Sequence, residues 1–304
     1  MGRFFDLGRA TKVTVALILL VVVCSVGYYL WDRQQQPTGS ALDYEAQRIE
    51  QLLQGNPSNP DAWIALGDIS LQQRKFDKAI SEYEQALSLD EDQPKAYMGL
   101  GLAYMEKEDA DRAVAYLNQA VALSEEAEFA HADVSLATLH YYLGKIYLED
   151  GELDLAFQEL TESLAFNRVN ADTIFLLGQV YEAQGDEAAA EANYLRALSL
   201  VPNFAEVYAQ LSNLYRAQGD EVSAAYNQAM SDLFSGSVAE AVEQLNAIVA
   251  SMPEKAEAYW GLGWGYEKTN MRDEAIAAYQ EAVSIDPQHR LARGALKRLG
   301  AGAY

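Results

Sequence analysis

Two glycine-rich stretches are the first places in this sequence where residue type and spacing suggest chemistry. Residues 99–101 read GLG and residues 261–265 read GLGWG, and glycines at such spacing let a backbone approach the phosphates of a nucleotide. A phosphate-binding loop follows a β-strand, however, whereas both stretches fall inside segments with helical periodicity. We therefore predict no nucleotide site at either stretch.

Metal ligands are few and scattered. The only cysteine, Cys24, lies in an apolar run, so neither an intramolecular disulfide nor a cysteine-rich metal site can form. The histidines lack neighbouring ligands at the spacing of a zinc site: His131, His140 and His289. The acidic runs lack the alternating ligands of a calcium loop, and residues 221–253 have no nucleophile, base or cofactor signature. We therefore predict that the protein is not an enzyme and has no catalytic residues, metal or cofactor.

The composition suits a folded helical protein with an acidic surface. Half of the residues are hydrophobic and only 7 are prolines. The formal net charge is −23, from 45 acidic and 22 basic residues, and such a chain repels nucleic acid and anionic lipid. We predict no nucleic-acid binding. The acidic surface either attracts a basic partner or keeps a long helical array soluble.

The elements that would position any functional side chain are helical hairpins. In residues 171–204, bulky and small residues recur at helical spacing, Gly185 and Asp186 interrupt the pattern, and a second helical pattern ends before Pro202. The same offsets recur in four other units of the same length: 60–93, 94–127, 137–170 and 256–289. Each unit is therefore predicted to form two packed helices.

Small residues at fixed offsets allow close contact between the two helices of a hairpin. The first helix of each unit carries a glycine and the second an alanine: Gly67, Gly101, Gly144, Gly178 and Gly263, then Ala79, Ala113, Ala156, Ala190 and Ala275. Bulky residues such as Leu177 and Tyr194 then fill the space between the helices. We predict that the tyrosines of the second helices are core residues.

These 34-residue units resemble the tetratricopeptide repeat family, and the resemblance covers most of residues 60–289. It implies an all-α superhelical solenoid of stacked helix pairs that binds protein or peptide partners. We expect this repeat domain to span residues 42–300. Helices at 43–54 and 290–299 are predicted to cap its ends.

Two departures from the repeat pattern are expected to alter the array. Nine additional residues, 128–136, should lengthen a helix or form a loop. In the irregular section 205–255, Ser212 replaces the usual glycine and two repeat frames overlap by about half a repeat. We therefore predict that the helix at 221–234 closes one unit and opens the next.

The family resemblance also indicates where a partner would bind. Its ligands often contact the fifth, ninth and twelfth positions of the first helices, and many of these positions are apolar here. The predicted partner-binding residues, including two tryptophans of the last full repeat, are Ile64, Leu71, Met98, Leu102, Met105, Tyr141, Leu148, Phe175, Trp260 and Trp264. Either they form an apolar groove whose acidic rim attracts a basic segment, or other helices of the chain bury them.

The N-terminal region predicts membrane attachment. Residues 1–12 carry three basic residues, and residues 13–31 contain no charge over nineteen residues, which as a helix would span roughly 28 Å. We predict a cytoplasmic N-terminus, a transmembrane helix at 13–31 and a flexible linker at 32–41. The repeat domain would then be extracytoplasmic, anchored in the inner (plasma) membrane. A cleaved signal peptide and a lipoprotein signal at Cys24 are the alternatives.

The functional hypothesis from sequence combines these elements. It is a non-catalytic, membrane-anchored protein-interaction scaffold, adaptor or chaperone-like holder in a bacterial cell-envelope assembly complex, with the repeats in the periplasm. The alternative is a cytosol-facing receptor for protein import into an organelle. The residues that bind chaperone C-termini in related receptors are not present at the corresponding positions, such as Ile64 and Asp68, which disfavours that alternative.

Overall fold

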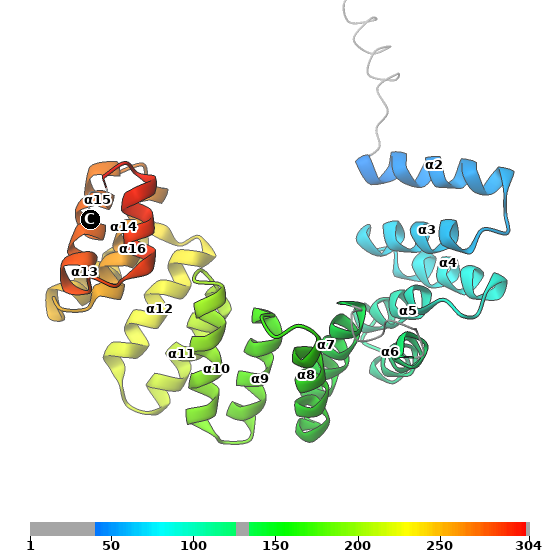
Figure 1. Cartoon of the computed structure of the whole chain (residues 1–304), viewed down its shortest axis with the longest axis horizontal. Helices are drawn as coiled ribbons and strands as arrows, with labels where there is room; N and C mark the ends of the chain where they lie inside the picture. The colour runs from blue at the N-terminus through cyan, green and yellow to red at the C-terminus, as the bar shows by residue number, and fades with distance from the viewer. Residues whose placement is uncertain (1–39, 126–133, 302–304) are drawn as a thin grey trace, which may run out of the picture. The chain divides into compact units, whose positions relative to one another are not determined.

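The computed structural model describes residues 40–125 and 134–301, and these residues form α-helices joined by short connections. Two compact units divide the chain between Glu91 and Asp92. Within each unit, helices that follow one another in the chain pack side by side (Figure 1). The predicted all-α class is therefore confirmed for the described part of the chain.

The described residues of the first unit, 40–91, form three helices: α2 (Ala41–Gly55), α3 (Pro60–Gln72) and α4 (Phe76–Leu89). α2 begins with a capping box, in which the Ser40 hydroxyl accepts from the backbone N–H of Asp43 and the Asp43 carboxylate accepts from the backbone N–H of Ser40. Leu53 of α2 packs against Ala62 and Leu66 of α3. This contact covers the apolar side of α3, which is the role expected of a capping helix.

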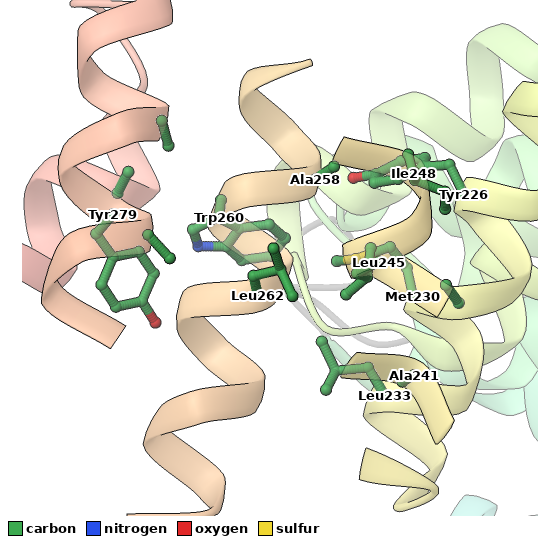
Figure 2. Close-up of a cluster of buried hydrophobic side chains, with 14 of the residues drawn as sticks. Tyr226, Met230, Leu233, Ala241, Leu245, Ile248, Ala258, Trp260, Leu262 and Tyr279 are labelled. Carbon is green, nitrogen blue, oxygen red and sulfur yellow. The ribbon is translucent and has the colours of Figure 1, made fainter. Parts of the chain in front are cut away.

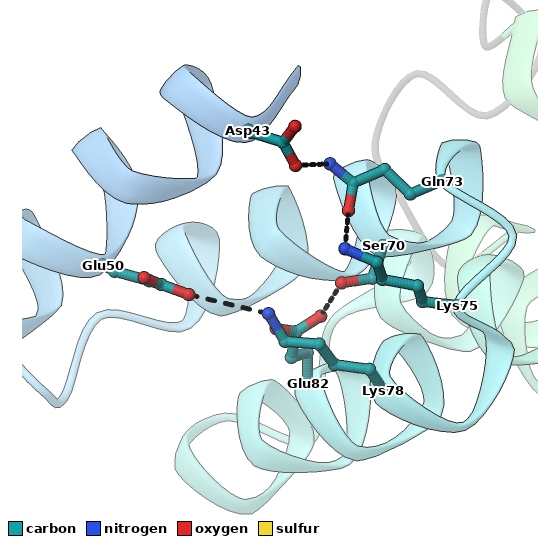
Figure 3. Close-up of polar contacts among 7 residues, drawn as sticks. All are labelled: Asp43, Glu50, Ser70, Gln73, Lys75, Lys78 and Glu82. Carbon is teal, nitrogen blue, oxygen red and sulfur yellow. Dashed lines mark hydrogen bonds and ion pairs between the residues drawn. The ribbon is translucent and has the colours of Figure 1, made fainter. Parts of the chain in front are cut away.

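Polar contacts also join α2 to the hairpin that it covers (Figure 3). Lys78 of α4 lies 3.5 Å from a carboxylate oxygen of Glu50 on α2 and 3.4 Å from one of Glu82. Ser70 of α3 donates a hydrogen bond of 2.6 Å to Glu82. Glu82 is buried, and this bond compensates part of its desolvation cost. The contacts therefore satisfy a buried carboxylate and add a weak, exposed ion pair between α2 and the hairpin.

The second unit contains the remaining described helices. They are α5 (Pro94–Glu106), α6 (Ala110–Glu125), α7 (Val134–Glu149), α8 (Leu153–Phe166), α9 (Ala171–Ala183), α10 (Glu187–Leu200), α11 (Ala205–Ala217), α12 (Glu221–Ser235), α13 (Val238–Ser251), α14 (Ala256–Lys268), α15 (Arg272–Ile285) and α16 (Arg290–Arg298). In Figure 1, α7 to α16 follow one another as neighbouring helices in chain order. The additional residues predicted at 128–136 lie mostly outside the described part of the chain.

Close approach of the paired helices depends on their glycines, as predicted. A Cβ atom added at Gly178 of α9 would lie 2.5 Å from the Cε1 atom of Tyr194 on α10, far inside van der Waals contact. The other first helices show the same seam, with each glycine facing a bulky side chain sixteen residues later: Gly67 with Tyr83, Gly101 with Leu117, Gly144 with Leu160, and Gly263 with Tyr279. Tyr194 is fully buried. The tyrosines of these second helices are therefore core residues.

α12 packs against both α11 and α13 and also contacts α14. This is the sharing that the overlapping repeat frames predict. On the side of α11, Ser212 stands where other units have glycine. Its hydroxyl donates a hydrogen bond of 2.8 Å to the backbone carbonyl of Ala224. Met230 of α12 packs in the same core as α14, where a Cβ atom at Gly261 would lie 2.7 Å from its sulfur. The glycines of residues 261–265 thus serve helix packing.

The core around α14 is shown in Figure 2. Trp260 and Leu262 of α14 lie between Tyr279 of α15 on one side and Met230 and Leu245 of α12 and α13 on the other. Side chains from α11 to α16 contribute to this cluster. Because neighbouring helices cover α14 on these sides, most of its apolar surface is buried within the chain.

The predicted localisation requires correction. None of the helices in residues 40–125 and 134–301 is both long and apolar enough to cross a membrane. This finding contradicts a single-pass protein of the inner membrane with an extracytoplasmic repeat domain, and we do not retain that localisation. The segments from which it was predicted, 1–12, 13–31 and nearly all of 32–41, lie outside the described residues.

Candidate functional site

A cleft of about 640 Å³ lies along the first helices of two consecutive hairpins and the start of a third. We call it the α7–α9 groove. Its walls come from α7, α9 and the beginning of α11, and its lining residues are Tyr141, Lys145, Leu148, Glu149, Asp172, Phe175, Leu176, Gln179, Phe204 and Glu206. The groove thus brings together three of the residues predicted from sequence to bind a partner: Tyr141, Leu148 and Phe175.

The hairpin cores hold the apolar side chains of the groove in place. Asn170 caps α9, with its side chain accepting 3.1 Å from the backbone N–H of Thr173. One turn later, the ring centroid of Phe175 lies 5.8 Å from that of Tyr194 and 5.3 Å from that of Phe204. Tyr141 and Phe175 are both half-buried, and both pack against the core formed by side chains of α8 and α9. The groove therefore has an ordered apolar floor that is partly open to solvent.

The rim of the groove is acidic. Glu149, Asp172 and Glu206 are exposed carboxylates, and Lys145 is the cation among the lining residues. Lys145 lies 3.9 Å from Glu149, one helical turn along α7. An exposed ion pair of this kind is weak. The carboxylates of the rim outnumber the ammonium of Lys145, and this excess of negative charge gives the groove a negative potential. Such a potential favours a partner that carries basic residues.

Tyr141 is a neutral hydrogen-bonding group in this groove. Burial raises the pKa of Tyr141, and the negative charge of Asp172 raises it further. The phenol therefore keeps its proton over the whole physiological range. It can offer both an apolar ring and a hydroxyl donor to a bound segment.

A tyrosine hydroxyl holds a carboxylate of α9 that follows the lining residue Gln179 by three positions, and sequence reasoning did not find this contact. Tyr194 donates a 2.5 Å hydrogen bond to Glu182 of α9. Equivalent bonds join Tyr279 to Glu267 (2.6 Å) and Tyr83 to Asp68 (2.8 Å). The signal was present in the sequence: hairpins with tyrosine at this position carry an acid at the ninth or twelfth position, and those with leucine do not.

Two predicted partner-binding residues are buried in the chain's own core. Ile64 is 5% exposed and Trp260 is 4% exposed. Trp260 lies 6.0 Å from Phe234 and 6.2 Å from His289 between ring centroids. Other helices of the chain thus cover Trp260, and partner binding at Ile64 and Trp260 stays a prediction.

The other predicted residues are half-buried and are not among the lining residues of the α7–α9 groove. They are Leu71 of α3, Met98, Leu102 and Met105 of α5, and Trp264 of α14. Trp264 stacks at an angle on Trp260 and lies under Lys268, whose ammonium is 5.5 Å from its ring centroid. Partner binding at these residues stays a prediction.

The histidines within the described residues serve structure. The Nδ1 atom of His140 lies 2.7 Å from Glu159, and its ring stacks on Phe166. His289 caps α16 by accepting from the backbone N–H of Ala292. In the described part of the chain, no group of three or more His, Cys, Asp or Glu residues could hold a metal ion. His131 and Cys24 lie outside that part.

Comparison with family models identifies the class of protein that this geometry defines. A TPR repeat model matches residues 67–108, and tetratricopeptide repeat models match residues 94–126, 171–204 and 256–289. The chain therefore contains tetratricopeptide repeats, which confirms the resemblance seen in its sequence. Repeats of this class generally bind protein partners. A comparison with curated proteins finds no significant match to this chain.

Three solved structures illustrate the similarity in fold. BtubC (BKLC) from P. vanneervenii is 20% identical, with a TM-score of 0.55 over 66% of this chain and 92% of that one. The C-terminal part of a TPR repeat-containing protein from Cytophaga hutchinsonii is 17% identical, with a TM-score of 0.52 over 84% of this chain and 94% of that one. A chain of the APC/C hetero-tetramer Cut9-Hcn1 is 20% identical, with a TM-score of 0.50 over 85% of this chain. This chain spans only 46% of that relative, and these similarities show the fold alone.

Proposed function

We propose that this protein is a non-catalytic interaction scaffold or adaptor, able to act as a chaperone-like holder, that binds a segment of another protein in the α7–α9 groove. The observation that carries this proposal is the groove itself, which combines an apolar floor with an acidic rim on consecutive first helices. The envelope-assembly context depended on the membrane assignment and is not part of the proposal.

The groove favours an amphipathic partner segment. Its volume of about 640 Å³ falls within the range that accommodates a few bulky side chains. Tyr141, Leu148 and Phe175 would contact the apolar anchors of such a segment, and the carboxylates of the rim would attract its basic residues. A helix that lays its apolar face into the groove satisfies both requirements.

Binding is tested by panning random peptides displayed on phage against the full-length chain. A photo-crosslinking residue is then placed at Tyr141 in the groove, and separately at Leu155, an exposed position of α8 outside the lining residues. We expect the selected peptides to crosslink from Tyr141 and not from Leu155. This outcome would assign the contact to the groove.

A matched pair of substitutions completes the test. Leu148→Asp places a charge in the floor of the groove, whereas Leu155→Asp makes the same change on an exposed surface. Loss of a central anchor costs about 2 kcal/mol or more, so Leu148→Asp should weaken peptide binding about 30-fold. Leu155→Asp should bind like the unmodified chain, and circular dichroism controls for folding. Crosslinking from Leu155, or equal affinity of both variants, would overturn the proposal.

A further inference from the structure

The chain itself shows how a carboxylate held by tyrosine binds a guanidinium. Arg298 of the terminal helix α16 lies 2.5 Å from a carboxylate oxygen of Glu267 on α14. The hydroxyl of Tyr279 on α15 donates 2.6 Å to the same oxygen. A tyrosine, a carboxylate and an arginine therefore meet where the helix after a hairpin packs onto it.

The α9–α10 hairpin repeats this arrangement without the arginine. Tyr194 follows Glu182 by twelve residues, as Tyr279 follows Glu267, and its hydroxyl donates 2.5 Å to the Glu182 carboxylate. Arg298 follows Glu267 by 31 residues, and the residue at the same offset from Glu182 is Asn213. Within the described residues, no lysine or arginine pairs with Glu182. The described chain therefore leaves this carboxylate charge unbalanced.

Glu182 is placed to meet a segment bound in the groove. It follows Gln179, a lining residue, by three positions on α9, so both side chains lie on the same helix face. Glu182 is half-buried. Burial raises the pKa of Tyr194 far above its usual value, and the hydrogen bond to Glu182 raises it further. The hydroxyl thus remains a donor that fixes the position of the Glu182 carboxylate.

We propose that Glu182 selects a basic residue of the partner, an arginine that binds the tyrosine-held carboxylate as Arg298 binds Glu267. The proposal rests on the proposed function of the groove and specifies one positively charged residue of the partner. Arginine suits the site because a guanidinium carries several N–H donors, and in the Arg298–Glu267 pair one of them reaches the same oxygen that the tyrosine hydroxyl holds. Apolar anchors in the groove and an arginine beside them then define the segment.

The test uses a peptide that panning has selected on the full-length chain. Each arginine of this peptide is replaced in turn by citrulline, which keeps the shape and removes the charge. The affinities of all copies are measured by fluorescence anisotropy for the unmodified chain, Glu182→Gln and Tyr194→Phe. Glu162→Gln, an exposed acid of α8 outside the groove lining, is the control for a change in net charge.

We expect one arginine whose replacement weakens binding to the unmodified chain about tenfold or more, as truncation of a hydrogen-bonded charge pair does. The same replacement should change binding to Glu182→Gln less than twofold, and Glu162→Gln should behave like the unmodified chain. Tyr194→Phe keeps the ring that packs on Gly178 and should show an intermediate loss. If Glu182→Gln does not fold, the result with Tyr194→Phe decides.

The outcomes separate the two proposals. A peptide that crosslinks from Tyr141 but shows no coupling between its arginines and Glu182 would overturn the selection by Glu182 and leave the groove intact. Failure to obtain any peptide that depends on the groove would overturn both. If Glu162→Gln removes the effect of the arginine replacement as fully as Glu182→Gln does, the effect depends on net charge alone. That result would also refute the role of Glu182.

Discussion

Gly178→Ala is the sharpest test of the packing on which the groove depends. Gly178 lies on α9, and an added Cβ atom would be 2.5 Å from Cε1 and 2.6 Å from Cδ1 of Tyr194. The normal separation of such carbon atoms is about 3.5–4.0 Å. The ring of Tyr194 is fully buried and its hydroxyl is bonded to Glu182. The clash can therefore be relieved only by moving α10 away from α9 or by breaking that bond.

The expected magnitude follows from three contributions. Overpacking costs about 1–3 kcal/mol, and loss of a hydrogen bond to a charged group costs about 1.5–3 kcal/mol. The change from glycine to alanine inside a helix returns about 1 kcal/mol. We therefore expect Gly178→Ala to destabilise the α9–α10 hairpin by about 1.5–5 kcal/mol. Gly294→Ala is the matched control, because nothing lies within 4 Å of its added Cβ atom in α16, and it should stabilise α16 by up to about 1 kcal/mol.

The assay must report on single hairpins, since the stability of a repeat array is local. Hydrogen exchange of backbone amides, followed by mass spectrometry of peptides from α9, α10 and α16, gives that resolution. Gly178→Ala should lower protection in α9 and α10, and Gly294→Ala should not lower it in any helix. Equal protection of α9 in Gly178→Ala and the unmodified chain would refute the close-packed seam.

Three further substitutions test other parts of the structure. Trp260→Ala should lower the free energy of unfolding in urea by about 3–5 kcal/mol, because it empties a buried site beside Phe234 and His289; a loss below about 1 kcal/mol would contradict its burial. Ser212→Gly removes the hydrogen bond to the Ala224 carbonyl and should reduce exchange protection of α11 by about 1–2 kcal/mol, whereas increased protection would show that glycine fits better. Asp220 caps α12, and hydrogen bonds from the backbone and hydroxyl of Ser223 lower the pKa of Asp220. The ionised carboxylate of Asp220 therefore stabilises the folded protein above the unfolded-state pKa of about 3.9. This stabilisation is lost as pH falls through the lower folded-state pKa. Asp220→Asn should consequently weaken α12 protection at neutral pH, and the two proteins should converge in acid; a difference independent of pH would rule out the charge effect.

Local spacing was sufficient to predict the hairpins. The sixteen-residue separation in sequence between Gly178 and Tyr194 recurs between the glycine and its bulky partner in every full unit. A single sequence therefore contains several independent instances of the same packing rule. The sharing of α12 was also predictable, because two overlapping frames demand the same helix. These features depend on contacts between residues that are close in sequence, and periodicity records such contacts directly.

The groove was predictable only in part, because the sequence shows which residues face inward but not what covers them. Phe175 and Trp260 occupy the same position in their repeats. Phe175 lines the groove, whereas Phe234 and His289 lie beside Trp260 and help to bury it. Phe234 comes from the shared helix α12, which also contacts α14. Contact of the shared helix α12 with α14 thus helps to make the position of Trp260 a core position, whereas the same position at Phe175 lines a cleft.

The same reasoning explains why the two positions must respond differently to substitution. An anchor in the groove is half-exposed, so a change such as Leu148→Asp should reduce binding more than stability. A residue covered by its own chain, such as Trp260, should reduce stability and leave peptide binding at the distant groove unchanged, because separate repeats are coupled mainly through their neighbours. Measuring both affinity and unfolding for both variants therefore distinguishes an inner surface that is open only at α7–α9 from one that is open along the whole unit. Weakened binding in a folded Trp260→Ala protein would show that the second is correct.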